Sequence, residues 1–228
     1  MEESDYQAES EVYNIGTYEG DRNENNERNG YGVALLPNKD KYQGNYENGK
    51  RHGEGVYEFK SGAKYSGMYF ENLKQGNGEF SYPDTSRYIG EWFENKRNGR
   101  GIYHYENGDT YEGNWRENKR HGFGKYTLKS RNQVFSGIWS EGKMHGMGTI
   151  KSQTFTFKGQ WHQGCPYGKG KYYFPHLNCV QVGHYVPNYL LESEDIKVNS
   201  YSQSAWFAKA IEKMSESDAL EMKIDSEM

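Results

Sequence analysis

The sequence predicts an all-β protein: one elongated sheet in which repeated antiparallel β-hairpins follow one another as a meander, with a short C-terminal helix and polar tails. Three observations predict this fold. A phrase recurs every 22 to 24 residues, polar and non-polar positions alternate within it, and dipeptides that favour tight turns separate the copies. Self-similarity at a fixed period is typical of repeat proteins, in which each unit packs mainly against its neighbours.

The repeat is clearest in residues 111–124, which read Y-E-G-N-W-R-E-N-K-R-H-G-F-G. A pair of glycines separated by one residue closes every copy, from Gly30 and Gly32 in the first to Gly168 and Gly170 in the seventh. The seven copies begin at the aromatic residues Tyr18, Tyr42, Tyr65, Tyr88, Tyr111, Phe135 and Phe157.

Each copy is expected to form one hairpin. Tyr111, Gly113 and Trp115 alternate with polar residues, and a period of two returns in residues 122–126, which indicates two strands. The charged stretch 116–121 between them is expected to form the hairpin turn, giving about fourteen short strands in all. The copies are joined at dipeptides typical of tight turns, namely Pro37-Asn38, Ser61-Gly62, Pro83-Asp84 and Asn107-Gly108.

The regular glycines predict how such a sheet is stabilised. Glycine weakens a strand interior, so its repeated use indicates positions that another group must approach closely. We expect the glycines to be floors on which the aromatic rings of neighbouring strands lie, so that the rings form the core. The composition agrees, with 16% aromatic residues and 28 glycines but only 33% hydrophobic residues.

Three segments are expected along the chain: an acidic N-terminal tail at 1–17, the repeat array at 18–187 with seven copies and a partial eighth, and an acidic C-terminal tail at 188–228. The first copy departs from the others, because Arg22 and Ala34 replace aromatic residues, and we interpret it as a cap.

The C-terminal tail contains one patterned stretch. Phe207, Ile211 and Met214 have helical spacing, with Trp206 beside them, which predicts a short amphipathic helix near 204–214. Such a helix would dock on the array or on another subunit. The alternative is a solvated, partly helical tail.

The pattern Y-x-G-x-W/Y, followed by E-N-x-K-R-x-G-x-G, resembles the MORN repeat over residues 18–185. The first copy and the closing segment at 170–185 are also similar to MORN-repeat subunits of the radial spoke head of motile cilia. This resemblance implies a structural protein of the cytoskeleton, in the ciliary or flagellar axoneme. Its implied partners are other radial spoke head subunits, a second copy of itself, and projections of the central pair. Contact with these projections is implied to influence dynein through the spoke. A cytoplasmic location is expected from the N-terminus, which is acidic where a signal peptide would be basic and then apolar.

The second aromatic of each copy predicts an interaction surface. Equivalent positions in successive copies lie two strands apart, roughly 9.5 Å, so these rings are expected to form an exposed row on one face. Two aromatics of the C-terminal tail are expected to make a second contact. The predicted protein-binding residues are Tyr46, Tyr69, Trp92, Trp115, Trp139, Trp161, Trp206 and Phe207.

No catalytic, metal or cofactor site is expected. His52, His121 and His145 share one repeat position, but copies roughly 9.5 Å apart cannot bring two of them to one metal ion. The glycine pairs do not extend to G-x-G-x-x-G, and no P-loop sequence occurs. Nucleic-acid binding is not expected either, because the rings are needed for packing.

A second function is considered for the basic hairpin turns. A MORN scaffold could bind anionic phospholipids through Lys50-Arg51, Lys96-Arg97, Lys119-Arg120 and Lys143. Each of these turns also carries a glutamate, so we favour a solvated edge that neutralises itself. Membrane association is therefore not expected. The net charge of −4 is divided unevenly, since residues 1–17 and 189–228 each carry −5 and the array between them +6.

Overall fold

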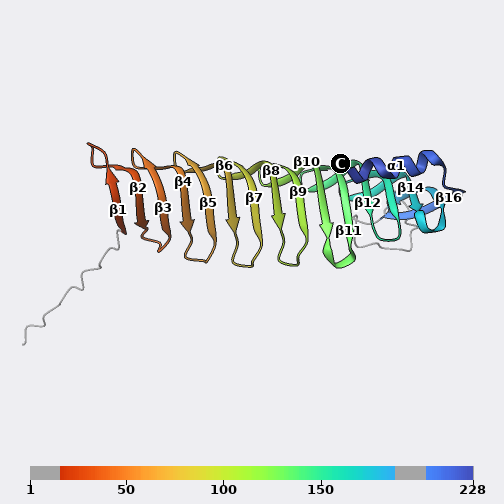
Figure 1. Cartoon of the computed structure of the whole chain (residues 1–228), viewed down its shortest axis with the longest axis horizontal. Helices are drawn as coiled ribbons and strands as arrows, with labels where there is room; N and C mark the ends of the chain where they lie inside the picture. Colours follow the sequence, from red (N-terminus) through yellow and green to blue (C-terminus); the bar gives the residue numbers. More distant parts are fainter. Residues whose placement is uncertain (1–15, 188–203, 228) are drawn as a thin grey trace, which may run out of the picture.

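The computed structural model describes residues 16–187 and 204–227, which form one open antiparallel sheet of 16 strands and one α-helix, α1 (Glu216–Glu227). The strands are neighbours in sequence order, from β1 at one end of the sheet to β16 at the other. They run across the long axis of the molecule, and α1 lies at the end that holds β12, β14 and β16 (Figure 1). The predicted single-sheet meander is confirmed.

The first seven hairpins correspond to the seven copies of the repeat. Their strands are β1 (Thr17–Arg22), β2 (Arg28–Leu35), β3 (Lys41–Glu47), β4 (Lys50–Glu58), β5 (Lys64–Phe70), β6 (Leu73–Ser81), β7 (Arg87–Phe93), β8 (Lys96–His104), β9 (Thr110–Arg116), β10 (Lys119–Leu128), β11 (Gln133–Ser140), β12 (Lys143–Lys151), β13 (Thr156–His162) and β14 (Cys165–Phe174). Two 3₁₀ turns, Lys129–Arg131 and Pro175–Leu177, precede β11 and β15 (Cys179–Pro187).

The hairpin turns are shorter than the sequence pattern predicted. Between β9 and β10 only Glu117 and Asn118 lie outside the strands, with φ angles of 47° and 69°. Two consecutive positive φ angles are typical of a type I′ turn, whose twist matches that of the flanking strands. Lys119 and Arg120 are therefore strand residues, and Arg120 pairs directly with Trp115.

The two glycines of each pair have different roles. The first, such as Gly53 with φ 67° or Gly122 with φ 65°, lies in the left-handed region beside a shift in register. Such bulges bend a strand and increase its twist. The second, such as Gly55 or Gly124, stays in the ladder opposite another glycine.

The prediction of a helix near 204–214 is wrong, because these residues form strand β16 (Ser204–Lys213). Nine of them pair antiparallel with β15, from Ser204 opposite Pro187 to Lys213 opposite Cys179. Without β16, the backbone of β15 would be an unpaired edge. Pairing with β16 gives the backbone N–H and C=O groups of β15 hydrogen-bond partners. The free energy of these hydrogen bonds outweighs the preference for a helix that the spacing of the apolar residues indicates.

The helix instead begins after Ser215. The Ser215 hydroxyl accepts from the Asp218 N–H at 3.1 Å, and the Asp218 carboxylate accepts from the Ser215 N–H at 3.1 Å. This reciprocal pair is a capping box, which fixes the start of α1. Most of the expected N-terminal tail, and residues 188–203 of the C-terminal tail, lie outside the described residues.

Candidate protein interaction site

One face of the sheet, here called the ring face, carries the aromatic residues and the paired glycines. The first tyrosine of a copy lies flat along its own strand. In the second copy, the Tyr42 hydroxyl donates to the Asn45 carbonyl at 2.9 Å. The Tyr42 ring carbon Cζ lies 2.5 Å from the position a Cβ atom would take on Gly55, so only glycine fits beneath it. The expectation that rings lie on glycine floors is confirmed at this position.

The second aromatic of each copy packs edge-on against these tyrosines. The ring of Trp115 lies 5.2 Å from Tyr111 in its own copy and 5.4 Å from Tyr88 in the preceding one, at interplanar angles of 89° and 81°. Its indole N–H donates to the Gly101 carbonyl at 3.2 Å. Each ring therefore joins two copies, which is the nearest-neighbour packing of a repeat protein.

The predicted row of rings exists, but its expected exposure is wrong. The relative exposures of the six rings lie between 4% and 6%. The buried residues are Tyr46, Tyr69, Trp92, Trp115, Trp139 and Trp161. In this conformation these rings belong to the core, and a partner has no access to their faces.

Cationic side chains cover the row. The Arg97 guanidinium lies 4.5 Å from the centre of the Trp115 ring, and Arg120 lies 4.3 Å from that of Trp139. Arg97 also donates to the Asn118 carbonyl in the next hairpin turn, at 3.0 Å. Cation–π contacts of this kind stabilise by about 0.5–2 kcal/mol each. A pattern of alternation cannot reveal this cover, because the cation and the ring come from different strands.

Three of the four basic turns make ion pairs with the next copy. Lys50 pairs with Glu71 at 3.3 Å and Lys96 with Glu117 at 3.2 Å, and Lys119 pairs with Glu141. The arginine beside each lysine points to the ring face. Anionic phospholipids would have to compete with these pairs for the lysines.

The opposite face, here called the open face, carries apolar side chains that the sequence interpretation did not use. Phe70 is 54% exposed and lies directly opposite Leu73, and Phe123 is 45% exposed and lies opposite Ile138. Their signal in the sequence is an apolar residue beside a ring or glycine of the repeat, as in Trp92-Phe93. The large apolar residues exposed on the strands of this face include Tyr31, Leu35, Met68, Phe70, Leu73, Ile89, Phe93, Phe123, Ile138 and Met147.

The two predicted contact residues of the C-terminal tail lie on different faces. Trp206 is partly buried on the ring face, 5.1 Å from the rings of both Tyr172 and Tyr185. Phe207 is 43% exposed on the open face and is stacked on His184 at 5.7 Å. Of the predicted protein-binding residues, Phe207 is therefore the most accessible.

A family model of the MORN repeat matches residues 24–41, 42–64, 65–87, 88–110, 111–133, 135–154 and 157–175. These matches cover most of the chain and follow the seven hairpins. The chain belongs to the MORN-repeat family.

Two curated relatives share short stretches with this MORN protein. It is 56% identical over 39 residues to the radial spoke head 1 homolog of Cyprinus carpio, and 61% identical over 33 residues to that of Mus musculus. These stretches are 17% and 14% of this chain and 18% and 11% of the relatives, so the alignments span less than a fifth of either protein.

Solved structures with related shapes have low sequence identity to this MORN protein. The TCP domain of Drosophila melanogaster SAS-4, solved with a proline-rich motif of Ana2, is 8% identical with a TM-score of 0.44 and covers 77% of this chain and 94% of its own. The TCP10 domain of Danio rerio CPAP is 9% identical with a TM-score of 0.36 and covers 72% and 82%.

Buried aspartates fix the turns between MORN copies, a role the sequence interpretation missed. The Asp109 carboxylate is 2% exposed and accepts from the Tyr126 hydroxyl at 2.6 Å and the Lys129 N–H at 2.8 Å. Burial alone would raise the pKa of Asp109, but these hydrogen bonds and one from Asn107 lower it overall. Asp40 has the same position and the same kind of partners in an earlier copy.

Within the described residues, no group of His, Cys, Asp and Glu side chains is arranged to hold a metal ion. The α-helix of this part of the chain is too short and too polar to cross a membrane.

Proposed function

We propose that this MORN array is a structural scaffold subunit of the radial spoke head in motile cilia and flagella. Two things support the proposal: the seven MORN repeats and the short stretches of identity with radial spoke head 1 homologs. The proposed partners are other radial spoke head subunits and a second copy of the chain, and the proposed location is the axoneme, within the cytoskeleton of the cytoplasm. In this proposal the scaffold transmits mechanical contact from the central-pair projections to the spoke, and this contact regulates dynein.

The observation that carries the scaffold role is the asymmetry of the two faces. The ring face is closed by its own arginines and lysines, whereas the open face presents pairs of exposed apolar residues such as Phe70 with Leu73. Exposed apolar residues that cluster on one face are typical of interaction surfaces. The docking surface is therefore proposed to be the open face, with Phe207 at its C-terminal end.

The packing of the array suits a part that transmits force. Each copy is joined to the next by backbone ladders, by a ring shared between copies, and by an arginine that bonds to the next turn. A displacement of one copy therefore moves its neighbours. Such an element passes a contact at one end to subunits bound along its length.

The test is assembly into the axoneme. The double variant Phe70→Ser with Leu73→Ser removes one exposed apolar pair and leaves the ring face intact. We expect it to melt like the wild type, yet to incorporate poorly and to co-precipitate less of the other spoke-head subunits. The matched control is Glu58→Gln with Lys64→Gln, which removes an exposed ion pair of 3.2 Å on β4 and β5. Normal incorporation of the folded double variant would contradict the proposal.

Binding to anionic vesicles distinguishes the lipid-binding alternative. Neutralising Lys96 and Lys119 removes two exposed charges and leaves Arg97 and Arg120 on their rings. We expect axonemal incorporation to be unaffected by this change. Vesicle binding that disappears in the same variant, together with lost incorporation, would favour the membrane instead.

A further inference from the structure

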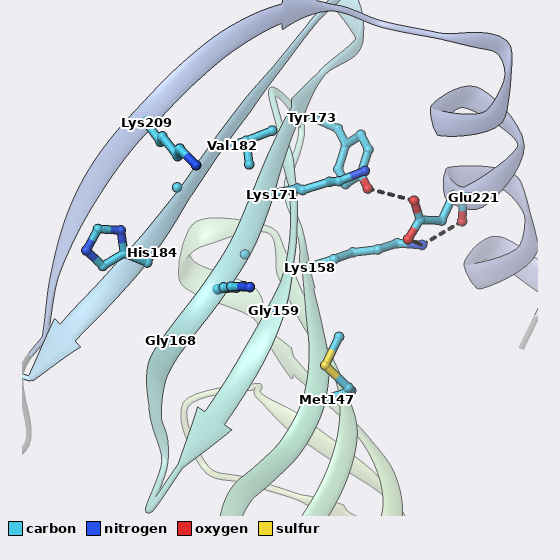
Figure 2. Close-up of a pocket in the computed structure, with 13 residues that line it drawn as sticks. Met147, Lys158, Gly159, Gly168, Lys171, Tyr173, Val182, His184, Lys209 and Glu221 are labelled. Carbon is cyan, nitrogen blue, oxygen red and sulfur yellow. Dashed lines mark hydrogen bonds and ion pairs between the residues drawn. The ribbon is translucent and has the colours of Figure 1, made fainter.

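Helix α1 is held against the open face by polar contacts with residues of β13 and β14 (Figure 2). The Lys158 ammonium donates to the Glu221 carbonyl at 2.6 Å and lies 3.8 Å from its carboxylate. The Tyr173 hydroxyl donates to the same carboxylate at 2.8 Å, and Lys171 pairs with Asp218 at 3.2 Å. An acidic segment of the chain is thus already bound to this part of the sheet.

The acidic residues of α1 neutralise positive charges that lie close together on the strands beneath the helix. Lys158 and Lys171 are direct cross-strand neighbours on β13 and β14. Like charges at such positions repel each other and destabilise a sheet. On the next pair of strands Lys169 lies opposite His184, so a third lysine adds to the charge. The carboxylates that pair with Lys158 and Lys171 belong to α1 rather than to a strand.

A groove of about 850 Å³ continues from α1 along this face. Its basic lining residues are Lys158, Lys169, Lys171, His184 and Lys209, and its acidic lining residue is Glu221. Met147 and Val182 add apolar surface, and Figure 2 shows Lys209 and His184 on the side away from α1. Within the described part of the chain, the ammonium groups of Lys169 and Lys209 have no carboxylate partner.

We propose that this groove binds an acidic polypeptide segment of a partner protein, alongside α1. Its carboxylates would pair with Lys169 and Lys209, and an apolar side chain of the segment would rest on Met147 and Val182. The groove lies at the C-terminal end of the open face, away from the apolar pair of Phe70 and Leu73. The proposal rests on the charges of this groove and not on the radial spoke assignment.

A polypeptide fits the groove better than other anions for two reasons. The first reason is that α1, itself a polypeptide, already binds beside the groove through side-chain carboxylates and a main-chain carbonyl. The groove is also hollowed, with Glu221 of α1 among its lining residues, so an extended chain fits along it better than a planar bilayer surface does. Charge complementarity of this kind favours fast association and makes it dependent on salt.

The experiment measures fluorescence anisotropy of labelled peptides with the full chain at about 50 mM salt, where screening is weak. One probe has the sequence of residues 1–15, which carries five acids and no bases, and the second has the sequence of residues 216–227. Each is paired with a version in which every acid is replaced by its amide. We expect the acidic probes to bind, their amide versions to bind at least about tenfold more weakly, and about 300 mM salt to weaken binding similarly.

The variant Lys169→Gln with Lys209→Gln is expected to weaken binding by about tenfold or more. The matched control, Lys41→Gln with Lys125→Gln, removes two exposed lysines elsewhere on the open face and should bind as the wild type does. Thermal unfolding of both variants checks that they remain folded.

Three results would overturn the proposal. One is the absence of binding by both acidic probes, and another is binding that the Lys169 and Lys209 changes leave intact. The third is tighter binding of anionic vesicles, or of a single-stranded RNA, that requires the same two lysines. Any of these would show that the groove does not select an acidic polypeptide.

Discussion

The ring carbon Cζ of Tyr111 lies 2.5 Å from the position that a Cβ atom would occupy on Gly124, in the neighbouring strand. The same relationship links Tyr88 to Gly101 and Tyr42 to Gly55. A methyl group on Gly124 would therefore displace a ring that is fully buried. This contact explains why glycine recurs at one position in strands that are otherwise rich in aromatic residues.

Gly124→Ala is expected to destabilise the protein by about 1–3 kcal/mol, because the buried ring has little room to move. Urea denaturation measures the change. Lys125→Ala, at the next residue but on the open face, should have little effect. The double variant Gly124→Ala with Tyr111→Ala should cost less than the sum of its single changes, because the clash is gone. Strict additivity would contradict the steric explanation.

Trp115→Ala is expected to cost about 3–5 kcal/mol, because the ring is 5% exposed and packs against two copies. Thermal and urea unfolding give the measurement. Phe123→Ser removes a ring of the neighbouring strand that is 45% exposed, and should leave stability nearly unchanged. Equal effects of the two changes would mean that the two faces are wrongly assigned.

Lys74→Arg is expected to stabilise the protein by about 0.5–1.5 kcal/mol. Lys74 lies 4.8 Å from the centre of the Trp92 ring, at the repeat position that Arg51 and Arg97 occupy in other copies. Those arginines donate to a carbonyl of the next turn, at Asn72 and Asn118, which a lysine at this position does not do. Arginine is also more weakly hydrated, so burying it over a ring costs less.

The same variant has a distinctive dependence on pH. Burial, and then the nearby charge of Arg51, lower the pKa of Lys74 from 10.5 to about 8. Between these values the unfolded chain keeps a proton that the folded chain has lost, so the wild type gains stability as the pH rises. The advantage of Lys74→Arg should therefore shrink between about pH 8 and pH 10.5. A constant difference would show that Lys74 titrates normally.

Asp109→Asn is expected to destabilise the protein by about 1–3 kcal/mol at neutral pH, because the buried turn loses a charged acceptor. Since the folded pKa of Asp109 lies below 3.8, its contribution is present above that value and is lost as the pH falls through the folded pKa. The gap between wild type and variant should therefore close in acid. Glu106→Gln, at an exposed neighbour, serves as the control. A gap that persists at about pH 2 would assign the effect to packing.

The sequence by itself determined the hairpins, their order and the use of rings on glycine. A kept period of 22 to 24 residues places equivalent groups in equivalent strands, and alternation separates two faces. These features depend on residues close together in the chain. Tyr111 and Trp115 could therefore be assigned to one face of their strand from their spacing alone, and so could Gly124 and Tyr126 on the next strand.

Only the tertiary structure decided which face is covered. Alternation is symmetric, and the cover of Trp115 comes from Arg97 of another strand, so no local pattern reveals it. The same holds for residues 204–213, whose helical spacing is overridden by the unpaired backbone of β15. It holds for α1 as well, because Lys158 and Glu221 are 63 residues apart in the chain and meet only when the sheet has formed.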